Sequence, residues 1–357
     1  MPTTSLVPGA PASPLVADAL RAADDVAGFG TDVAATLAWC REFGRDAPRV
    51  GEGRTREVWD LLAAAAARDV SAARMLEPHL DALSILAQAA HDLGGDRMAA
   101  ALEPLRAGTE SSWGVFAAEA AGVALVARRG PQGWALHGTK PWCSLAAHLT
   151  NALVTASLDD GRRALFAVDM RGPGVQPHAG PWIARGMPDV VSAPVDFDGA
   201  PAVPVGEPGW YLTRAGFAWG GMSVAACWWG GAVGVAGALQ SAARSERADQ
   251  VALVHLGRAD AALWAARAVL AEAAALIDAG ASSALGDRVL AERVRGVVAD
   301  AANLVLTEAD AALGPAPLVA DLAHARRVAD LHLYLRQHHA LRDSARLGRE
   351  LVAGAPA

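Results

Sequence analysis

The chain has 357 residues, of which 53% are hydrophobic and 19% charged, and its formal net charge is −7. A chain of this length buries about 75% of its unfolded surface, so it can form a large core without disulfides or a structural metal. The net negative charge and the absence of a long basic run argue against nucleic acid as a partner. Cys40, Cys143 and Cys227 form no C-x-x-C pair, which favours neither a disulfide framework nor a zinc site and fits a reducing cytoplasm.

The N-terminal part of the chain predicts a short arm followed by helices. Residues 1–15 are rich in Pro, Ser and Thr and lack the basic start and apolar core of a signal peptide, so we expect a disordered arm. Residues 16–110 repeat apolar side chains with helical spacing, most clearly between Val70 and Leu93. They predict an N-terminal helical domain.

Residues 111–212 change to short apolar runs separated by Gly, Pro and Asp. Such runs predict a small antiparallel β domain. The segments 128–133 and 159–161 carry the turn residues of β-hairpins, the second with a strong Asp-Gly signal.

Residues 213–353 return to long helical patterns. We predict an antiparallel bundle of four long helices. Gly280 and the Gly314-Pro315 pair mark turns between them. The predicted helices cover about 216–247, 251–280, 286–312 and 317–353.

Phe217 to Leu239 contains no charged residue and is long enough to cross a bilayer. The segment is isolated and rich in glycine, so a buried bundle helix is favoured and no membrane association is predicted. Each glycine inside a helix costs about 1 kcal/mol relative to alanine, so several glycines indicate close approach to neighbouring helices or to a ligand.

Two motifs in the β region are the most specific feature of the sequence. Residues 133–144 read GWALHGTKPWCS, and residues 195–199 read VDFDG. Together with the order of elements, they resemble the acyl-CoA dehydrogenase superfamily. The resemblance implies a mainly α fold with a middle β domain: a helical domain, a small antiparallel β domain that lies against FAD, and a C-terminal four-helix bundle.

The resemblance also implies cofactor-binding residues. Trp142 stands where the family packs an aromatic ring beside the flavin, and Ser144 where a hydroxyl hydrogen-bonds to it. Because residues i and i+2 of a strand share a face, both should meet the same ligand. Phe116 and Ala118 match the strand that offers backbone groups to the flavin.

Two later motifs of the family are eroded. The "R-x-x-F-G" motif, whose Arg reaches a pyrophosphate on a neighbouring subunit, is replaced by residues 244–250, which read RSERADQ. The "Q-x-x-G-G" motif is replaced by residues 311–315, which read AALGP. Arg247 or Arg258 are alternative sources of positive charge, although both have the pattern of helix-surface residues. Whether FAD is retained stays open.

The catalytic glutamate of the family is missing. It lies eight residues after an Asp, and counting eight from Asp330 gives His338; its alternative position falls near Val224. His338 and the adjacent His339 are therefore the candidate catalytic residues. Neighbours on a helix point about 100° apart, so at most one faces the site. Neutral histidine can accept a proton near pH 7. The C-terminal histidines lack i, i+4 spacing, so no metal site is predicted.

The resemblance implies an FAD-dependent oxidoreductase that desaturates an acyl thioester or a related substrate between its α and β carbons. Two alternatives stay open: a flavin-dependent monooxygenase of the same fold, and a non-catalytic ligand-binding or partner subunit that has lost FAD. The expected partners are a small-molecule substrate, with acyl-CoA as one candidate, and further copies of the chain in a homodimer or homotetramer. A hetero-oligomer is also open. We expect a cytoplasmic protein.

Overall fold

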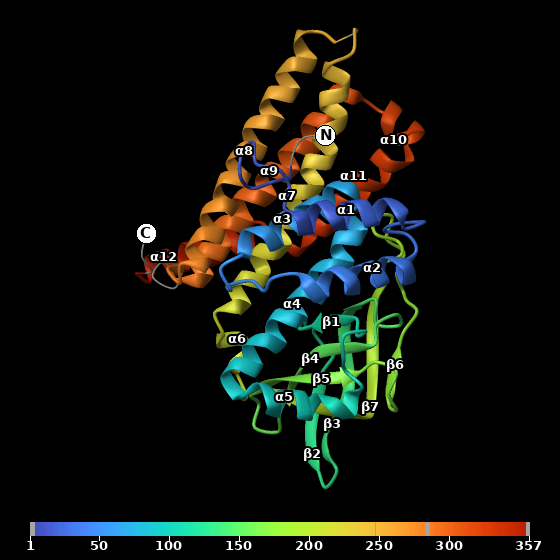
Figure 1. Ribbon diagram of the computed structural model, residues 1–357, viewed down its shortest axis with the longest axis vertical. Helices are drawn as coiled ribbons and strands as arrows, with labels where there is room; N and C mark the ends of the chain where they lie inside the picture. Colours follow the sequence, from blue (N-terminus) through green and yellow to red (C-terminus); the bar gives the residue numbers. More distant parts are fainter. Residues whose placement is uncertain (1–3, 247, 283–285, 355–357) are drawn as a thin grey trace.

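The computed structural model describes residues 4–246, 248–282 and 286–354 (Figure 1). The helices are α1 (Pro14–Asp25), α2 (Val33–Asp46), α3 (Thr55–Arg68), α4 (Val70–Leu93), α5 (Gly95–Leu102), α6 (Trp210–Thr213), α7 (Gly216–Ala243), α8 (Gln250–Asp278), α9 (Asp287–Leu313), α10 (Ala316–Ala320), α11 (Leu322–Tyr334) and α12 (Leu341–Val352), with 3₁₀ turns η1 (Glu103–Leu105) and η3 (Leu335–Gln337). The strands are β1 (Trp113–Phe116), β2 (Leu125–Gly130), β3 (Gly133–Ser144), β4 (Asn151–Ser157), β5 (Arg163–Asp169), β6 (Val175–Pro177) and β7 (Ser192–Val205).

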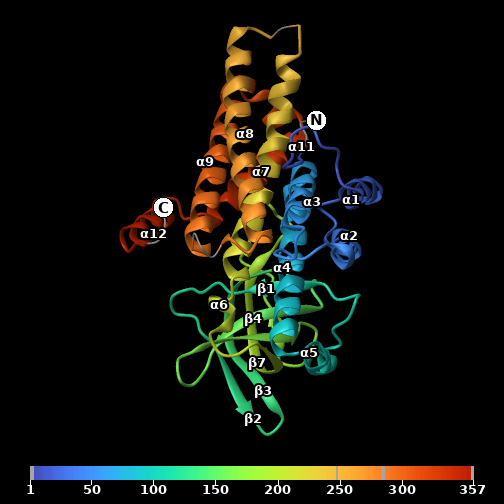
Figure 2. The same cartoon turned by 60° about the vertical axis from the view of Figure 1, so that its left-hand side comes forward.

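The β domain lies at one end of the molecule and the long helices α7, α8 and α9 at the other (Figure 1). Helix α4 runs from the helical part down to the β domain. Figure 2 shows α1 and α2 on one side of α3 and α4, with α12 on the opposite side of the bundle. The predicted mainly α fold with a middle β domain is confirmed.

The β domain is a seven-stranded sheet that closes on itself. The strand order is β1-β4-β2-β3-β7-β5, and β4 also pairs with β5. The predicted hairpins are both present, with Gly130 opposite Gly133 and Ser157 opposite Arg163. Most strand pairs are antiparallel, as expected, but β4 is parallel to β1 and, at one residue pair, to β2.

Helix α7 is the core helix of the bundle. A Cβ atom on Gly230 would lie 2.2 Å from the carbonyl oxygen of Ala63, and one on Gly234 would lie 2.8 Å from that of Ala67. The glycines therefore let the α7 backbone approach α3, as expected. Among the described residues α7 is the one helix long and apolar enough to cross a membrane, but 83% of its most apolar stretch is buried inside the protein.

This close approach predicts a clear difference between two glycines. Replacing Gly230 by Ala should lower the free energy of unfolding by about 2 to 3 kcal/mol, because the new methyl group overlaps a backbone carbonyl. Gly257 on α8 has no atom within 4 Å of its added Cβ. Gly257→Ala should raise the free energy of unfolding by about 0.5 to 1 kcal/mol through helix propensity. Urea denaturation followed by circular dichroism measures both; equal effects would contradict the packing of α3 on α7.

The described part of the N-terminal arm is ordered against the helices, contrary to the expectation of disorder over residues 1–15. Leu6 is 1% exposed. Its N–H donates to Asp60 Oδ1 at 2.7 Å, and its carbonyl accepts from Arg267 at 3.0 Å. One buried side chain with both backbone groups paired is enough to fix the arm in place.

The last predicted helix, residues 317–353, is wrong as a single element. Asp321 caps α11 by accepting from the N–H of His324, so the chain restarts there after α10. A second break follows η3, where His338 is extended and Ala340 adopts a φ of +48°. Asp343 at the start of α12 accepts from the backbone N–H of His339 at 3.0 Å and so stabilises this turn.

Candidate functional site

Trp142 sits on a strained bulge at the end of β3. The register with β7 shifts between Lys140 and Cys143, and Trp142 has a φ of +59°. This left-handed conformation costs an ordinary residue about 1–2 kcal/mol. The indole is nevertheless 58% exposed. An exposed aromatic side chain held at an energetic cost is typical of a binding position rather than of a core.

Ser144 does not share the exposure of Trp142, because the bulge interrupts the alternation on which that expectation depended. The serine is 8% exposed. Its hydroxyl accepts from Arg74 Nη2 at 2.9 Å and lies 2.7 Å from Ser192 Oγ. Arg74 belongs to α4, so Ser144 joins the β domain to the helical part of the protein.

The other two predicted cofactor residues lie at the end of β1. The ring of Phe116 is buried and folds over Gly114, where an added Cβ would lie 2.9 Å from it. Ala118 follows the strand and is exposed. Because the Phe116 side chain is used in the core, Phe116 itself can serve a ligand only through its backbone.

The two predicted catalytic histidines differ in their surroundings. The side chain of His338 is 9% exposed, with Nε2 3.7 Å from Asp343 Oδ2. Its ring packs edge-to-face on Trp228 at 6.1 Å. Burial lowers the pKa of His338 below its usual value, although Asp343 opposes this shift, so the imidazole is neutral near pH 7. The side chain of His339 is 61% exposed and lies 3.3 Å from Asp343.

A chain of contacts joins Ser144 to His338. The guanidinium of Arg74 lies 5.8 Å from the ring centroid of Tyr334. Tyr334 packs edge-to-face on Trp228 at 6.3 Å, and Trp228 contacts His338. Within the described ranges, the buried Trp228 Nε1 and Tyr334 Oη have no hydrogen-bond partner. The structure therefore gathers predicted residues from β3 and from the C-terminal region around one polar cluster.

Sequence reasoning missed a polar stripe on α4. Arg74, Glu77, Asp81, Ser84 and Gln88 recur every three or four residues on a helix that is otherwise apolar. The stripe faces glycines of α7, where an added Cβ on Gly220 would lie 3.0 Å from Asp81 Oδ1. The heptad-like spacing is the signal that could have found it.

The polar stripe and the start of α7 enclose a small cleft. Its polar lining includes Glu77, Asp81, Ser84, Gln88, Arg214 and Ser223. The free space is about 10 Å³, room for about one water molecule. Within this lining, Arg214 donates to Gln88 Oε1 at 2.7 Å.

Glu77 is the unusual member of this stripe. It is 7% exposed. Burial raises the pKa of its carboxyl to about 8, and the neighbouring Asp81 adds to the shift, while Arg74 and Arg295 oppose it. Asp81 itself lies 3.8 Å from Arg214 Nη2.

The structure offers little replacement for the eroded pyrophosphate motifs. Arg258 pairs with Glu308 at 3.1 Å, and Arg247 lies outside the described residues. Across the described ranges, no group of three or more His, Cys, Asp or Glu side chains is placed to hold a metal ion.

Comparison with solved structures identifies the fold of this chain. No protein-family model matches the chain, and no curated protein matches it. The solved structure of KijD3 with FMN and dTDP-3-amino-2,3,6-trideoxy-4-keto-3-methyl-D-glucose is 22% identical, covers 100% of this chain and 98% of its own, and has a TM-score of 0.80.

Two further structures are similar. FMN-bound TdsC from Paenibacillus sp. A11-2 is 17% identical, covers 97% of this chain and 99% of its own, and has a TM-score of 0.79. Butyryl-CoA dehydrogenase from Megasphaera elsdenii is 18% identical, covers 95% of this chain and 98% of its own, and has a TM-score of 0.75. The chain therefore has the acyl-CoA dehydrogenase fold over its whole length.

Proposed function

We propose that this chain, which has the acyl-CoA dehydrogenase fold, is a flavin-dependent oxidoreductase whose flavin ring stacks on Trp142. The strained, exposed indole is the observation that carries the proposal, because a bound planar ring would cover it. We expect Ser144, and Arg74 that donates to it, to lie beside the ring, and the backbone near Ala118 to contact its edge.

FMN is the cofactor that we favour over FAD. FAD adds an adenosine phosphate to FMN, and the family motifs that reach its pyrophosphate are missing here. Arg258, one alternative cation, is paired with Glu308. FMN is also the flavin named in the KijD3 and TdsC structures.

The monooxygenase alternative fits the site better than desaturation of an acyl thioester. The position of the family's catalytic glutamate holds His338, with its imidazole neutral near pH 7. One of the similar structures is a dibenzothiophene monooxygenase and another is a nitrososynthase. We propose that reduced FMN and molecular oxygen together oxygenate a small molecule. When bound, reduced FMN would supply the electrons for this reaction.

The test distinguishes three possible roles: oxygenation, desaturation and no catalysis. Protein mixed with FMN, a flavin reductase and NADH should consume oxygen faster when an amine-bearing or aromatic substrate is added, and should form an oxygenated product. Reduction of bound flavin by an acyl-CoA without oxygen would instead support desaturation. Protein that neither binds flavin nor changes oxygen uptake would support the non-catalytic alternative.

The bundle also supports the expected assembly into a homodimer or homotetramer. Helix α8 exposes several large apolar side chains, among them Trp264 at 63% and Val251 at 58%. Monomers rarely leave such side chains open to water in one region. Light scattering should show a mass of at least two chains, and Trp264→Glu should lower it. A strictly monomeric wild-type protein would contradict this assembly or indicate a different partner chain.

A further inference from the structure

We propose that the Glu77 carboxyl takes the proton of a substrate N–H or O–H group through the water-sized cleft between α4 and α7. The inference rests on the proposed function, because it needs a substrate that turns over. The step moves one proton and no electrons: the substrate's N–H or O–H bond breaks, its electron pair stays on the substrate, and the proton joins a carboxylate oxygen of Glu77. The proton then leaves through the water in the cleft.

The first observation is that Glu77 lacks the partners that other buried acids have. Asp330 accepts from the N–H of Met187 and the hydroxyl of Ser71. Glu308 is held by His255 and Arg258. Glu77 is also buried, at 7% exposed, and the described part of the chain provides it neither a hydrogen bond nor an ion pair within 4 Å. A buried carboxyl normally costs stability unless it is paired, so an unpaired one points to function.

The second observation is that the nearby cations are engaged elsewhere. Arg74 donates to Ser144, and Arg214 donates to Gln88. Arg295 donates to the carbonyls of Gly221 and Gln337 and lies over the ring of Trp228. Each arginine lowers the cost of ionising Glu77 from a distance, but none neutralises it.

The third observation is position. Glu77 follows Arg74 by three residues on α4, so the two side chains are neighbours on one helix face. Arg74 contacts Ser144, the proposed flavin contact, and approaches Tyr334, whose buried hydroxyl has no partner within the described chain. Glu77 therefore lies between the proposed flavin site and a water-sized space, where a proton can arrive and leave.

The charged and titratable groups around Glu77 come from several elements. They are Arg74 and Asp81 on α4, Tyr211 on α6, Arg214 directly after it, Cys227 on α7, Arg295 on α9 and Tyr334 on α11. Asp81 is the negative neighbour that raises the pKa of Glu77, which is about 8. Burial also raises the pKa of Asp81, so the two neighbouring carboxyls titrate as a pair, whereas Cys227 and Tyr334 have pKa values far above neutral.

The direct test is infrared difference spectroscopy of the wild-type protein and Glu77→Gln. The C=O stretching band of a protonated carboxyl, absent in Glu77→Gln, should disappear with a midpoint near pH 8. Asp81→Asn is the matched variant: it removes the like charge and should move that midpoint down by at least about half a pH unit. If the Glu77 carboxyl is already fully ionised at every pH above about 6, the proposal is overturned.

Thermal stability gives a second readout that needs no activity. A carboxyl whose pKa is raised on folding contributes stability below its unfolded value, and this contribution is lost as the pH rises through the folded value. The Tm of the wild-type protein should therefore fall between about pH 5 and about pH 8, and Glu77→Gln should flatten this fall.

Turnover completes the test. The kcat of the wild-type protein should rise with pH through about 8 as Glu77 ionises. In Glu77→Gln, kcat should be at least about tenfold lower and should not rise with pH, while the affinity for FMN stays unchanged. Wild-type kcat and pH profile in Glu77→Gln would overturn the role of Glu77 alone. A wild-type protein that binds no FMN would overturn the proposed function itself.

Discussion

Replacing His338 by Ala should reduce turnover at least about 100-fold while FMN stays bound. The imidazole is the titratable side chain that the sequence resemblance proposes for the role of the family's catalytic glutamate. It is nearly buried, and its lowered pKa keeps it neutral and able to accept a proton near pH 7. Loss of the ring should also uncouple oxygen uptake from product and release hydrogen peroxide. Steady-state assays of oxygen, peroxide and product measure each effect.

Two neighbouring variants serve as controls for His338. His339→Ala removes an exposed ring next to it in sequence and should change turnover less than about threefold, because surface changes of this kind have small effects. Asp343→Asn removes the negative charge 3.7 Å from His338 and should lower the pKa of the histidine further. The acidic limb of the pH profile, where activity falls as His338 gains a proton, should then move to lower pH. Full activity in His338→Ala would remove it from the mechanism.

Replacing Trp142 by Gly should separate flavin binding from stability. The variant loses the stacking surface, so we expect the Kd for FMN to rise at least about tenfold, in line with about 1–3 kcal/mol for stacking of a planar ring on an aromatic side chain. Glycine relieves the strain at a φ of +59° but adds freedom to the unfolded chain. These effects offset each other, so the free energy of unfolding without flavin should change by less than about 1 kcal/mol.

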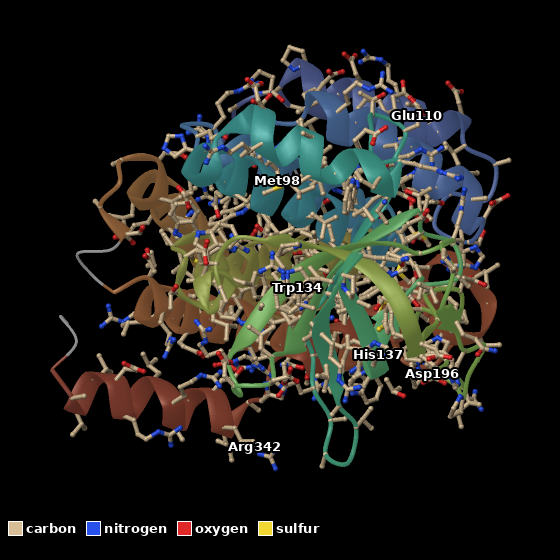
Figure 3. All side chains as sticks on the ribbon, turned by 90° about the horizontal axis from the view of Figure 1, so that it is seen from below. Met98, Glu110, Trp134, His137, Asp196 and Arg342 are labelled. Carbon is tan, nitrogen blue, oxygen red and sulfur yellow. The ribbon has the colours of Figure 1, made fainter. Side chains whose placement is uncertain are left out.

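Trp134 on the same strand is the matched control. Its ring is partly buried against Phe166, with centroids 5.4 Å apart, and Figure 3 shows it among the strands of the β domain. Trp134→Ala should destabilise the protein by about 2–4 kcal/mol and leave FMN affinity unchanged. If Trp142→Gly is destabilised like Trp134→Ala and still binds FMN, Trp142 is a structural residue and not a flavin contact.

The order of elements and the hairpins could be predicted from the sequence, because local turn residues and apolar periodicity determine them. The break after η3 could not. Residues 335–340 read LRQHHA and contain neither Gly nor Pro, and the turn is held by the contact of Asp343 with the His339 backbone. The sequence therefore predicted Asp343 on a different face of a continuous helix, whereas the structure places it beside His338.

The candidate site could also be predicted only in part from the sequence. Trp142 was identified from its motif, but its left-handed bulge depends on pairing with β7. Glu77 was missed because the apolar residues of α4 dominate its pattern, and its isolation is visible only when α7 and α9 are packed around it. Leu6 was missed because a single apolar residue in a polar arm carries no periodic signal.

Flavin binding tests the central claim most directly. Titration of the purified protein with FMN and with FAD, followed by flavin fluorescence and by the absorbance of the oxidised and reduced cofactor, gives the affinity for each. We predict saturable binding of FMN with a stoichiometry of one per chain, weaker binding of FAD, and a loss of FMN affinity in Trp142→Gly. A wild-type protein that leaves the spectra of both flavins unchanged, oxidised and reduced, would contradict the assignment of this chain as a flavoenzyme.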